Sequence, residues 1–425
     1  MKNILLLAYA VSPYRGSEYA VAWNHILNMS KDNKITVIYG TSGNHMGDFD
    51  EMNKFLSENK VENVNFVQVK PSKKTTALNF LNVKNIFNYS FYWAYNSWQI
   101  QVLDTVKQLM LQNKYDLIHF LCPIGYREPG YLWKLDVPYM WGPICGVNNV
   151  PWKLFKILTI KGKIRFLIRN VVNTMQFALS YRLRKALKGV DVLLTATTET
   201  KDKFDRICKN ESIYIPENCL LVSPVLNSEK FKIENGKYQI LFVGRLDDGK
   251  GCILFLKALM HVKRKELINV NILGDGPLKG QLEDFVLNNG LKDIVTFHGS
   301  MPRTEVMRMF DTSHLHVITS LSEANTTVVW EAMAHGVPTL ALDHCGMHDT
   351  ICEKCGIKIP VENSEQIVAD IAKEINELLD APSRFESLAY GTLECAQKYV
   401  WDARRKAMNS FYDLAIERYN KSTRC

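Results

Sequence analysis

Long hydrophobic runs are absent from this sequence of 425 residues. Crossing a membrane takes a helix of about eighteen or more consecutive apolar residues, and the most aromatic stretch, residues 87–98, is broken by Asn88, Asn96 and Ser97. We therefore expect no membrane-spanning segment. The opening MKNILLLAYA has a short apolar run, which predicts a buried first strand of a parallel sheet rather than a signal peptide.

Repeats, low-complexity segments and a cysteine framework are also absent. The ten cysteines are scattered, and Cys352 and Cys355 form a CxxC pair with no second pair or HxxxH partner nearby. We therefore expect free thiols in a reducing cytoplasm rather than a zinc site. A chain of this length with 47% hydrophobic and 23% charged residues predicts a soluble protein of two domains.

Acidic residues are missing between Val137 and Val190, while the whole chain has a net charge of +8. The basic residues of this stretch are Lys153, Lys156, Lys161, Lys163, Arg165, Arg169, Arg182, Arg184, Lys185 and Lys188. They alternate with apolar residues, a pattern typical of a helix lying on anionic lipid. A core-packed helix with a solvated basic face and a nucleic-acid surface are the alternatives. We favour an anionic membrane through 151–188, without nucleic acid, for a cytoplasmic protein at the inner face of the plasma membrane.

Short apolar strands alternate with helical patterns along the chain, which predicts doubly wound parallel sheets. The expected strands are 4–10, 35–40, 64–69, 115–121, 137–142 and 190–196, then 238–244, 268–274, 295–299, 315–320 and 337–342. Periodicity weakens between Pro216 and Phe231, which predicts a linker. We therefore predict an α/β fold of two Rossmann-like domains, at 1–215 and 225–395, facing a cleft that receives the ligand.

Two glycine-containing loops of the second domain follow predicted strands. In FVGRLDDGKG, the cations of Arg245 and Lys250 beside Gly244 suit a diphosphate, although a solvated turn is the alternative. In LGDGPLKG, Gly274 and Gly276 open a helix whose first amides attract anions. The spacing is not the dinucleotide G-x-G-x-x-G, which argues against a nicotinamide-dependent oxidoreductase.

A further loop, in SEANTTVVWEAMAHGVPTLAL, contains two carboxylates eight residues apart, Glu323 and Glu331. Along a helix this spacing is about 12 Å and about 80° of rotation, so the two cannot share a metal ion if both are helical. With Glu323 in a loop and Glu331 in the helix, they can instead bind hydroxyl groups at opposite ends of a long ligand. Asn325, Thr326 and Thr327 between them can cap the helix and present amides to a phosphate.

Three histidines invite a functional interpretation. His298, at the end of a predicted strand in FHGSMPRTEV, could be a ligand or base, although a packing residue is the simpler interpretation. His344 and His348 suggest a metal site, but no carboxylate stands at ligand spacing. We therefore expect no metal.

These motifs resemble, in order and spacing, the donor-binding domain of glycosyltransferase family 4, which has the GT-B fold. The resemblance covers about 240–360 through GRLDDGKG, LGDGP, FHGSMPRTEV and E-x7-E followed by AMAHGVPTLA. It is looser in AYAVSPYRGSEYAVAWN near the N-terminus. In this family a C-terminal helix crosses back to the first domain, which we expect for 396–425.

The resemblance implies a retaining, metal-independent transfer of a sugar from a UDP-, GDP- or other nucleoside-diphosphate sugar. Arg245 and Lys250 match the basic pair on the donor diphosphate. Glu323 matches the acid on the transferred sugar, and Glu331 the acid on the ribose. The catalytic group is thus Arg245, Lys250 and Glu323.

Three further positions of the donor site follow from the same resemblance. Gly16 matches a loop whose backbone approaches the phosphates, and His298 and Met301 lie where the base is framed. The expected acceptor is a glycan or lipid-linked intermediate of a surface polysaccharide, bound by the first domain.

The sequence departs from the family at two places. Many members have a histidine where this chain has Trp141-Gly142-Pro143, and His119 is no obvious replacement. DHCGMHDTI stands where many members have Gly-Gly-x-x-Glu. We therefore expect Asp343 and His344 or Met347 to contact the donor differently, which leaves the identity of the sugar open. The alternative function is a non-catalytic partner of another glycosyltransferase that binds nucleotide-sugar or lipid.

Overall fold

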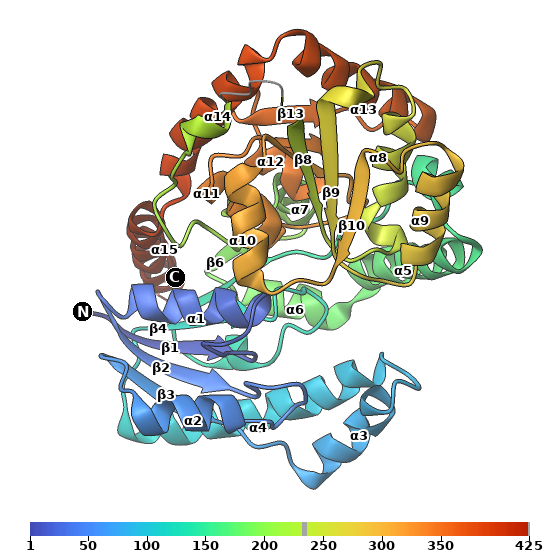
Figure 1. The fold of residues 1–425 in the computed structure, drawn as a ribbon. Helices are drawn as coiled ribbons and strands as arrows, with labels where there is room; N and C mark the ends of the chain where they lie inside the picture. Colours follow the sequence, from blue (N-terminus) through green and yellow to red (C-terminus); the bar gives the residue numbers. More distant parts are fainter. Residues whose placement is uncertain (232–235, 424–425) are drawn as a thin grey trace. The chain divides into compact units, whose positions relative to one another are not determined.

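The computed structural model describes residues 1–231 and 236–423, in two compact units (Figure 1). Unit 1 comprises Met1–Val147, Thr174–Glu217 and the residues from Asp402 onward. Unit 2 comprises Asn148–Asn173 and Asn218–Trp401. Residues 148–173 thus group with unit 2, although they stand before the predicted linker.

Unit 1 has seven parallel strands in the order β3-β2-β1-β4-β5-β6-β7. The strands are β1 Asn3–Ala8, β2 Lys34–Tyr39, β3 Val64–Gln68, β4 Leu117–Cys122, β5 Tyr139–Ile144, β6 Val192–Thr195 and β7 Ile213–Tyr214. The helices are α1 Glu18–Met29, α2 Asp50–Glu58, α3 Lys73–Val83, α4 Ser90–Gln112, α6 Tyr181–Lys188, α7 Thr198–Asp205 and α15 Trp401–Thr423. Helix α5, Ile160–Leu179, begins in unit 2 and ends in unit 1.

Both faces of the first sheet are buried, which explains why its strands are almost wholly apolar. Leu5 and Leu7 of β1 belong to one hydrophobic cluster, together with α4. Their neighbour Leu6 belongs to another, together with α1 and α15. Helix α15 contributes the buried Met408 and Tyr412 to that second cluster, so the C-terminal helix packs within unit 1, as expected.

Unit 2 has six parallel strands in the order β10-β9-β8-β11-β12-β13. The strands are β8 Tyr238–Val243, β9 Ile268–Leu273, β10 Val295–Gly299, β11 Leu315–Ile318, β12 Thr339–Leu342 and β13 Gly356–Ile359. The helices wholly within it are α8 Cys252–Leu259, α9 Lys279–Asn288, α10 Arg303–Thr312, α11 Thr327–Ala334, α12 Cys345–Thr350, α13 Ser364–Asp380 and α14 Ser383–Ala396. The predicted α/β fold with two parallel sheets is therefore confirmed.

The acid-free segment contributes to the core of unit 2. A 3-10 turn, Trp152–Ile157, and the first half of α5 bury Leu154, Leu158 and Phe166 among the residues of its largest hydrophobic cluster. Thr159 also donates from its amide and hydroxyl to the Asp248 carboxylate, at 2.7 and 2.8 Å. One face of this basic stretch is therefore ordinary core.

Candidate functional site: the carboxyl ends of the second sheet

The sheet of unit 2 has its topological switch point between β8 and β11. Strands β9 and β10 lie on one side of β8, and strands β11, β12 and β13 lie on its other side. Ligands of doubly wound sheets bind outside the carboxyl ends of the strands at such a point. Strand β8 ends at Val243 and β11 at Ile318. The loops that follow contain the GRLDDGKG motif and the first glutamate of E-x7-E, so both motifs lie at the switch point.

Lys250 and Glu323 meet between these loops. The Lys250 ammonium donates to Oε1 of Glu323 in an ion pair, and the two side chains are 23% and 27% exposed. Glu323 lies in the loop, as expected, eight residues before its helical counterpart. The loops are also joined directly, since the Leu321 amide donates to Gly249 O at 2.8 Å. Glu323 therefore holds Lys250 at the switch point, and a phosphate of a bound ligand would compete with Glu323 for the Lys250 ammonium.

Arg245 points outward and is only weakly held. Its side chain is 71% exposed, and its Nε lies 3.6 Å from Oδ2 of Asp247, a surface contact of small energy. The Asp247 carboxylate instead accepts a 2.9 Å hydrogen bond from the Gly249 amide and so closes the turn. The guanidinium of Arg245 thus remains available to an anion.

The glycines of this region allow neighbouring loops to touch. The Gly274 amide donates to Gly299 O at 2.7 Å, and the Gly244 amide donates to Leu273 O at 3.0 Å. Gly274 has φ of +133°, and a Cβ there would stand 2.0 Å from Gly244 O. A Cβ on Gly276 would stand 2.4 Å from Leu246 O. Both positions therefore require glycine for packing alone, whatever they contribute to phosphate binding.

Glu331 is a half-hidden carboxylate on α11. It forms a 2.9 Å ion pair with Arg303 of α10, and its side chain is 15% exposed against 58% for the arginine. Burial raises the pKa of Glu331 above its ordinary value, while Arg303 acts in the opposite direction. Sequence reasoning missed Arg303, because only the tertiary fold brings it to Glu331.

The expected capping of α11 by side chains is wrong. Thr326 occupies the position before the helix but makes no cap hydrogen bond. Asn325 is buried, and its Oδ1 accepts from the Thr350 hydroxyl at 2.9 Å. Its carbonyl accepts from Asn218 at 3.1 Å. Asn325 therefore stabilises the loop through Thr350 and Asn218 instead of capping the helix. The first helical residue is Thr327.

His298 lies in β10, an edge strand of the sheet, and Met301 lies just after that strand. The His298 ring is exposed and its Nε2 is 2.8 Å from Oδ1 of Asn271, so it is not a buried packing residue. Met301 is partly buried against the cluster of Leu241 and Phe310. Only Met301 thus has an apolar packing role in this structure.

Gly16, the predicted site residue of unit 1, is exposed between β1 and α1. A Cβ there would meet no atom within 4 Å. The following Ser17 has φ of +56°, and the preceding Arg15 forms a 2.6 Å ion pair with Glu51. The loop therefore presents open backbone at its glycine.

The family histidine missing at β5 is not supplied by His119. The ring of His119 is fully buried, with Nε2 at 2.8 Å from Gly142 O and Nδ1 at 3.1 Å from the Tyr412 hydroxyl. Burial lowers the pKa of His119 to about 4. Both ring nitrogens of His119 therefore have hydrogen-bond partners inside unit 1.

The divergent DHCGMHDTI segment packs behind Glu323. The Gly346 amide donates to Glu323 O at 3.2 Å, and His344 Nε2 lies 2.9 Å from Ser320 O. Asp343 Oδ1 lies 2.7 Å from His348 Nδ1 in a hydrogen bond and forms an ion pair with Lys358 at 3.5 Å. Over the described ranges, the only cluster of three or more potential metal ligands consists of cysteines elsewhere in unit 2.

Most of unit 2 is similar to a known family. Residues 226–390 match the family described as glycosyl transferases group 1. The chain is 24% identical over 257 residues to a D-inositol 3-phosphate glycosyltransferase of Streptomyces bingchenggensis, an alignment that covers 55% of each protein. The chain thus spans about half the length of this curated relative.

Two solved structures cover nearly the whole chain. Sucrose-phosphate synthase from Thermosynechococcus elongatus has a TM-score of 0.66 at 15% identity, over 97% of this chain and 98% of its own. Anabaena Alr3699/HepE in complex with UDP and glucose has a TM-score of 0.59 at 15% identity, over 97% and 100%. At such identities the likeness concerns the fold. Residues 226–390 therefore match the glycosyl transferases group 1 family, and the chain has the GT-B fold.

Proposed function

We propose that this protein is a retaining, metal-independent glycosyltransferase. It would transfer a sugar from a UDP-, GDP- or other nucleoside-diphosphate sugar to a lipid-linked or surface-polysaccharide intermediate. The observation that carries the proposal is the Lys250–Glu323 ion pair at the switch point of the second sheet. It is supported by the family match of residues 226–390 and by the UDP-bound HepE structure of like fold.

The two groups of the pair would have separate roles once a donor is bound. The donor diphosphate would form an ion pair with the Lys250 ammonium in place of Glu323. The exposed guanidinium of Arg245 would be a second cation for the diphosphate. Glu323, released from the lysine, then accepts hydrogen bonds from the sugar hydroxyls. In the transition state the leaving diphosphate gains charge, and the two cations bound to it would stabilise that charge. The two basic side chains would thereby perform the role that a metal ion has in other transferases.

Retention of configuration rests on the resemblance to the family. The acceptor hydroxyl would attack from the face that the leaving phosphate occupies, and the phosphate would take its proton. Direct measurement of the product anomer by NMR tests this part, since an inverted product contradicts retention but leaves the transferase assignment standing.

The experiment that tests the function is a mass-spectrometric screen of nucleoside-diphosphate sugars with the full-length protein. We expect one donor to be consumed, slowly to water and faster with acceptor-containing membrane extract. Nucleotide binding without consumption of any donor would favour the non-catalytic partner instead. No binding of any nucleotide would remove the proposal.

We also propose that α5 places the protein on an anionic membrane. The helix exposes an apolar stripe at helical spacing, Ile160, Ile164, Leu167, Ile168, Val171, Met175 and Leu179. The exposed Lys161, Lys163 and Arg165 are interspersed with the stripe. The opposite face, with Phe166 and Asn170, is buried. Exposed apolar side chains among cations fit the interface of anionic lipid better than water alone. Of the described residues, none forms a helix long and apolar enough to cross a membrane.

Flotation with vesicles tests this surface. We expect the protein to float with phosphatidylglycerol-containing vesicles at low salt and to float less with pure phosphatidylcholine. The triple change Ile164→Ser, Leu167→Ser and Ile168→Ser should abolish flotation, because it removes the centre of the stripe. Leu287→Ser, at a 60% exposed leucine of α9, is the matched control and should leave flotation intact. Failure of the unmodified protein to float would contradict the proposal.

A further inference from the structure

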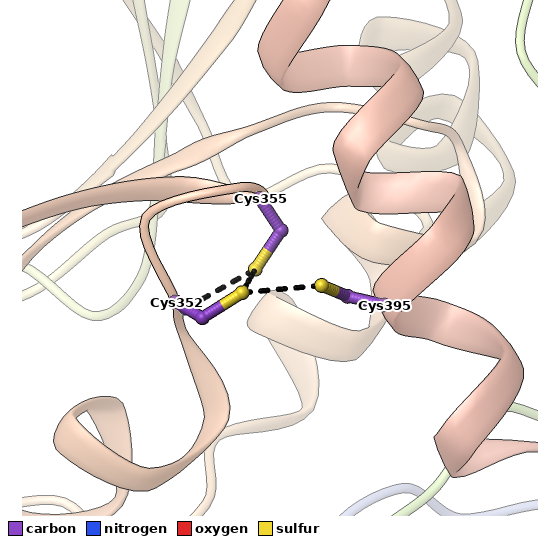
Figure 2. Close-up of side chains that lie close together, drawn as sticks. All are labelled: Cys352, Cys355 and Cys395. Carbon is purple, nitrogen blue, oxygen red and sulfur yellow. Dashed lines mark hydrogen bonds between the residues drawn. The ribbon is translucent and has the colours of Figure 1, made fainter.

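Three cysteine sulfurs converge in unit 2, and none of them is among the residues proposed for the donor site. Cys352 and Cys355 lie in the turn between α12 and β13, and Cys395 lies near the end of α14 (Figure 2). Sγ of Cys352 is 3.5 Å from Sγ of Cys355 and 3.1 Å from Sγ of Cys395. All three sulfurs lie within 4.8 Å of one another. Sequence reasoning predicted free thiols and did not connect Cys395 with the CxxC pair, because it stands 43 residues beyond Cys352.

The turn has one backbone hydrogen bond directed at sulfur. The Cys352 amide donates to the Cys355 sulfur at 3.2 Å, and the Cys355 amide donates to the Cys352 carbonyl oxygen at 2.9 Å. An amide that donates to sulfur favours the thiolate, which is the form that binds metal.

The cluster is held on both sides by backbone packing. A Cβ on Gly391 of α14 would stand 1.9 Å from Lys354 O, so the helix and the turn are in direct contact. The Thr392 hydroxyl donates to Cys355 O at 3.2 Å. The three sulfurs are thus brought together by two elements that touch, and not by one flexible loop.

We propose that Cys352, Cys355 and Cys395 form a binding site for a thiophilic divalent metal ion, with Zn²⁺ as the best match. Zinc binds thiolates at about 2.3 Å, which separates two sulfurs of a tetrahedron by about 3.8 Å. The separations of 3.5 and 3.1 Å from Cys352 to the other two sulfurs are each within about 1 Å of this value. The proposal departs from the sequence-based expectation of no metal, and it is independent of the proposed transferase function.

Three protein ligands leave one position of a tetrahedron for water or an external thiol. No other histidine, cysteine, aspartate or glutamate within the described ranges joins the cluster. Thiols bind metal as thiolates and release their protons, so metal affinity should rise with pH. The ion would join the turn before β13 to α14.

Cobalt substitution tests the site in the full-length protein, reduced and kept free of oxygen. We expect about one Co²⁺ per chain with a thiolate-to-metal charge-transfer band, displaced by Zn²⁺. Cys352→Ser, Cys355→Ser and Cys395→Ser should each weaken or abolish the band, while Cys208→Ser, at a cysteine of unit 1, should retain it. Zinc should also raise the melting temperature of the unmodified protein but not that of Cys395→Ser.

Circular dichroism and nucleotide binding, both measured in the absence of metal, show whether each cysteine variant is folded. A fully reduced protein that gives no band overturns the proposal, as does a band that survives in folded Cys395→Ser. Recovery of a Cys352–Cys395 disulfide with no metal binding after reduction would also overturn it. Loss of transfer activity alone would say nothing about the cysteines, so the two proposals fail separately.

Discussion

Replacing Lys250 by alanine is expected to lower the turnover of sugar transfer by about a hundredfold to a thousandfold, the usual effect of removing one charge-stabilising group from an active site. The side chain is 23% exposed and lies at the surface of the switch point, so its removal should leave the fold intact. Initial rates with the donor identified by the screen, together with thermal unfolding, measure both quantities. Turnover equal to that of the unmodified enzyme would remove Lys250 from the site.

A double-mutant cycle separates the two ways in which Lys250 could act. If the lysine only orients Glu323, Lys250→Ala should have no further effect in a Glu323→Gln background. If it also binds the diphosphate, as we propose, the second change should still weaken UDP or GDP binding measured by calorimetry. Lys263→Ala, at an exposed lysine of the same unit, is the matched control and should change neither rate nor affinity.

Replacing Glu331 by glutamine is expected to weaken nucleotide binding by about tenfold to a hundredfold, because hydrogen bonds from ribose hydroxyls to a carboxylate contribute about 1.5–3 kcal/mol. The effect should fall on affinity more than on turnover, since the ribose lies away from the reacting bond. Calorimetric titration with the nucleotide measures it. Unchanged affinity would place Glu331 outside the site.

The same carboxylate should make nucleotide binding depend on pH. Burial raises the pKa of Glu331, so acidification protonates it earlier than an exposed glutamate and affinity should fall there. Ionisation is harder in the folded protein than in the unfolded chain, so this group makes the free energy of unfolding fall as pH rises through its titration. Arg303→Ala removes the opposing cation and should move the loss of affinity to higher pH. Glu331→Gln should abolish this pH dependence.

Local patterns were enough to predict most of the second unit. Its strands at 238–244 and 268–274 are confirmed within one residue at their ends, since each is a short apolar run between turn residues. Strands β7 and β13 were missed, because β7 has only two residues and a lysine interrupts the apolar residues of β13, GIKI. The position of Glu323 in a loop and Glu331 in a helix is also confirmed.

Contacts between residues far apart along the chain could not be predicted from the sequence. Nothing in the spacing of Arg303 indicates that it would neutralise a carboxylate on the next helix, and nothing in Leu154 or Phe166 shows which unit buries them. The capping predicted for Asn325 was wrong because Thr350, twenty-five residues later, competes for its side chain. These outcomes depend on tertiary neighbours, which local propensity does not contain.

The discontinuous composition of unit 1 has a consequence for its synthesis. Helix α15 follows every other described element along the chain, yet Met408, Tyr412 and Ala415 are fully buried against α1 and the first sheet. While a ribosome makes the chain, unit 1 therefore displays an open apolar face until this last helix has emerged, whereas the described residues of unit 2 are all translated by Trp401. Domains usually mature in the order of translation. Here the unit that begins first can complete its core only after the other has been made in full.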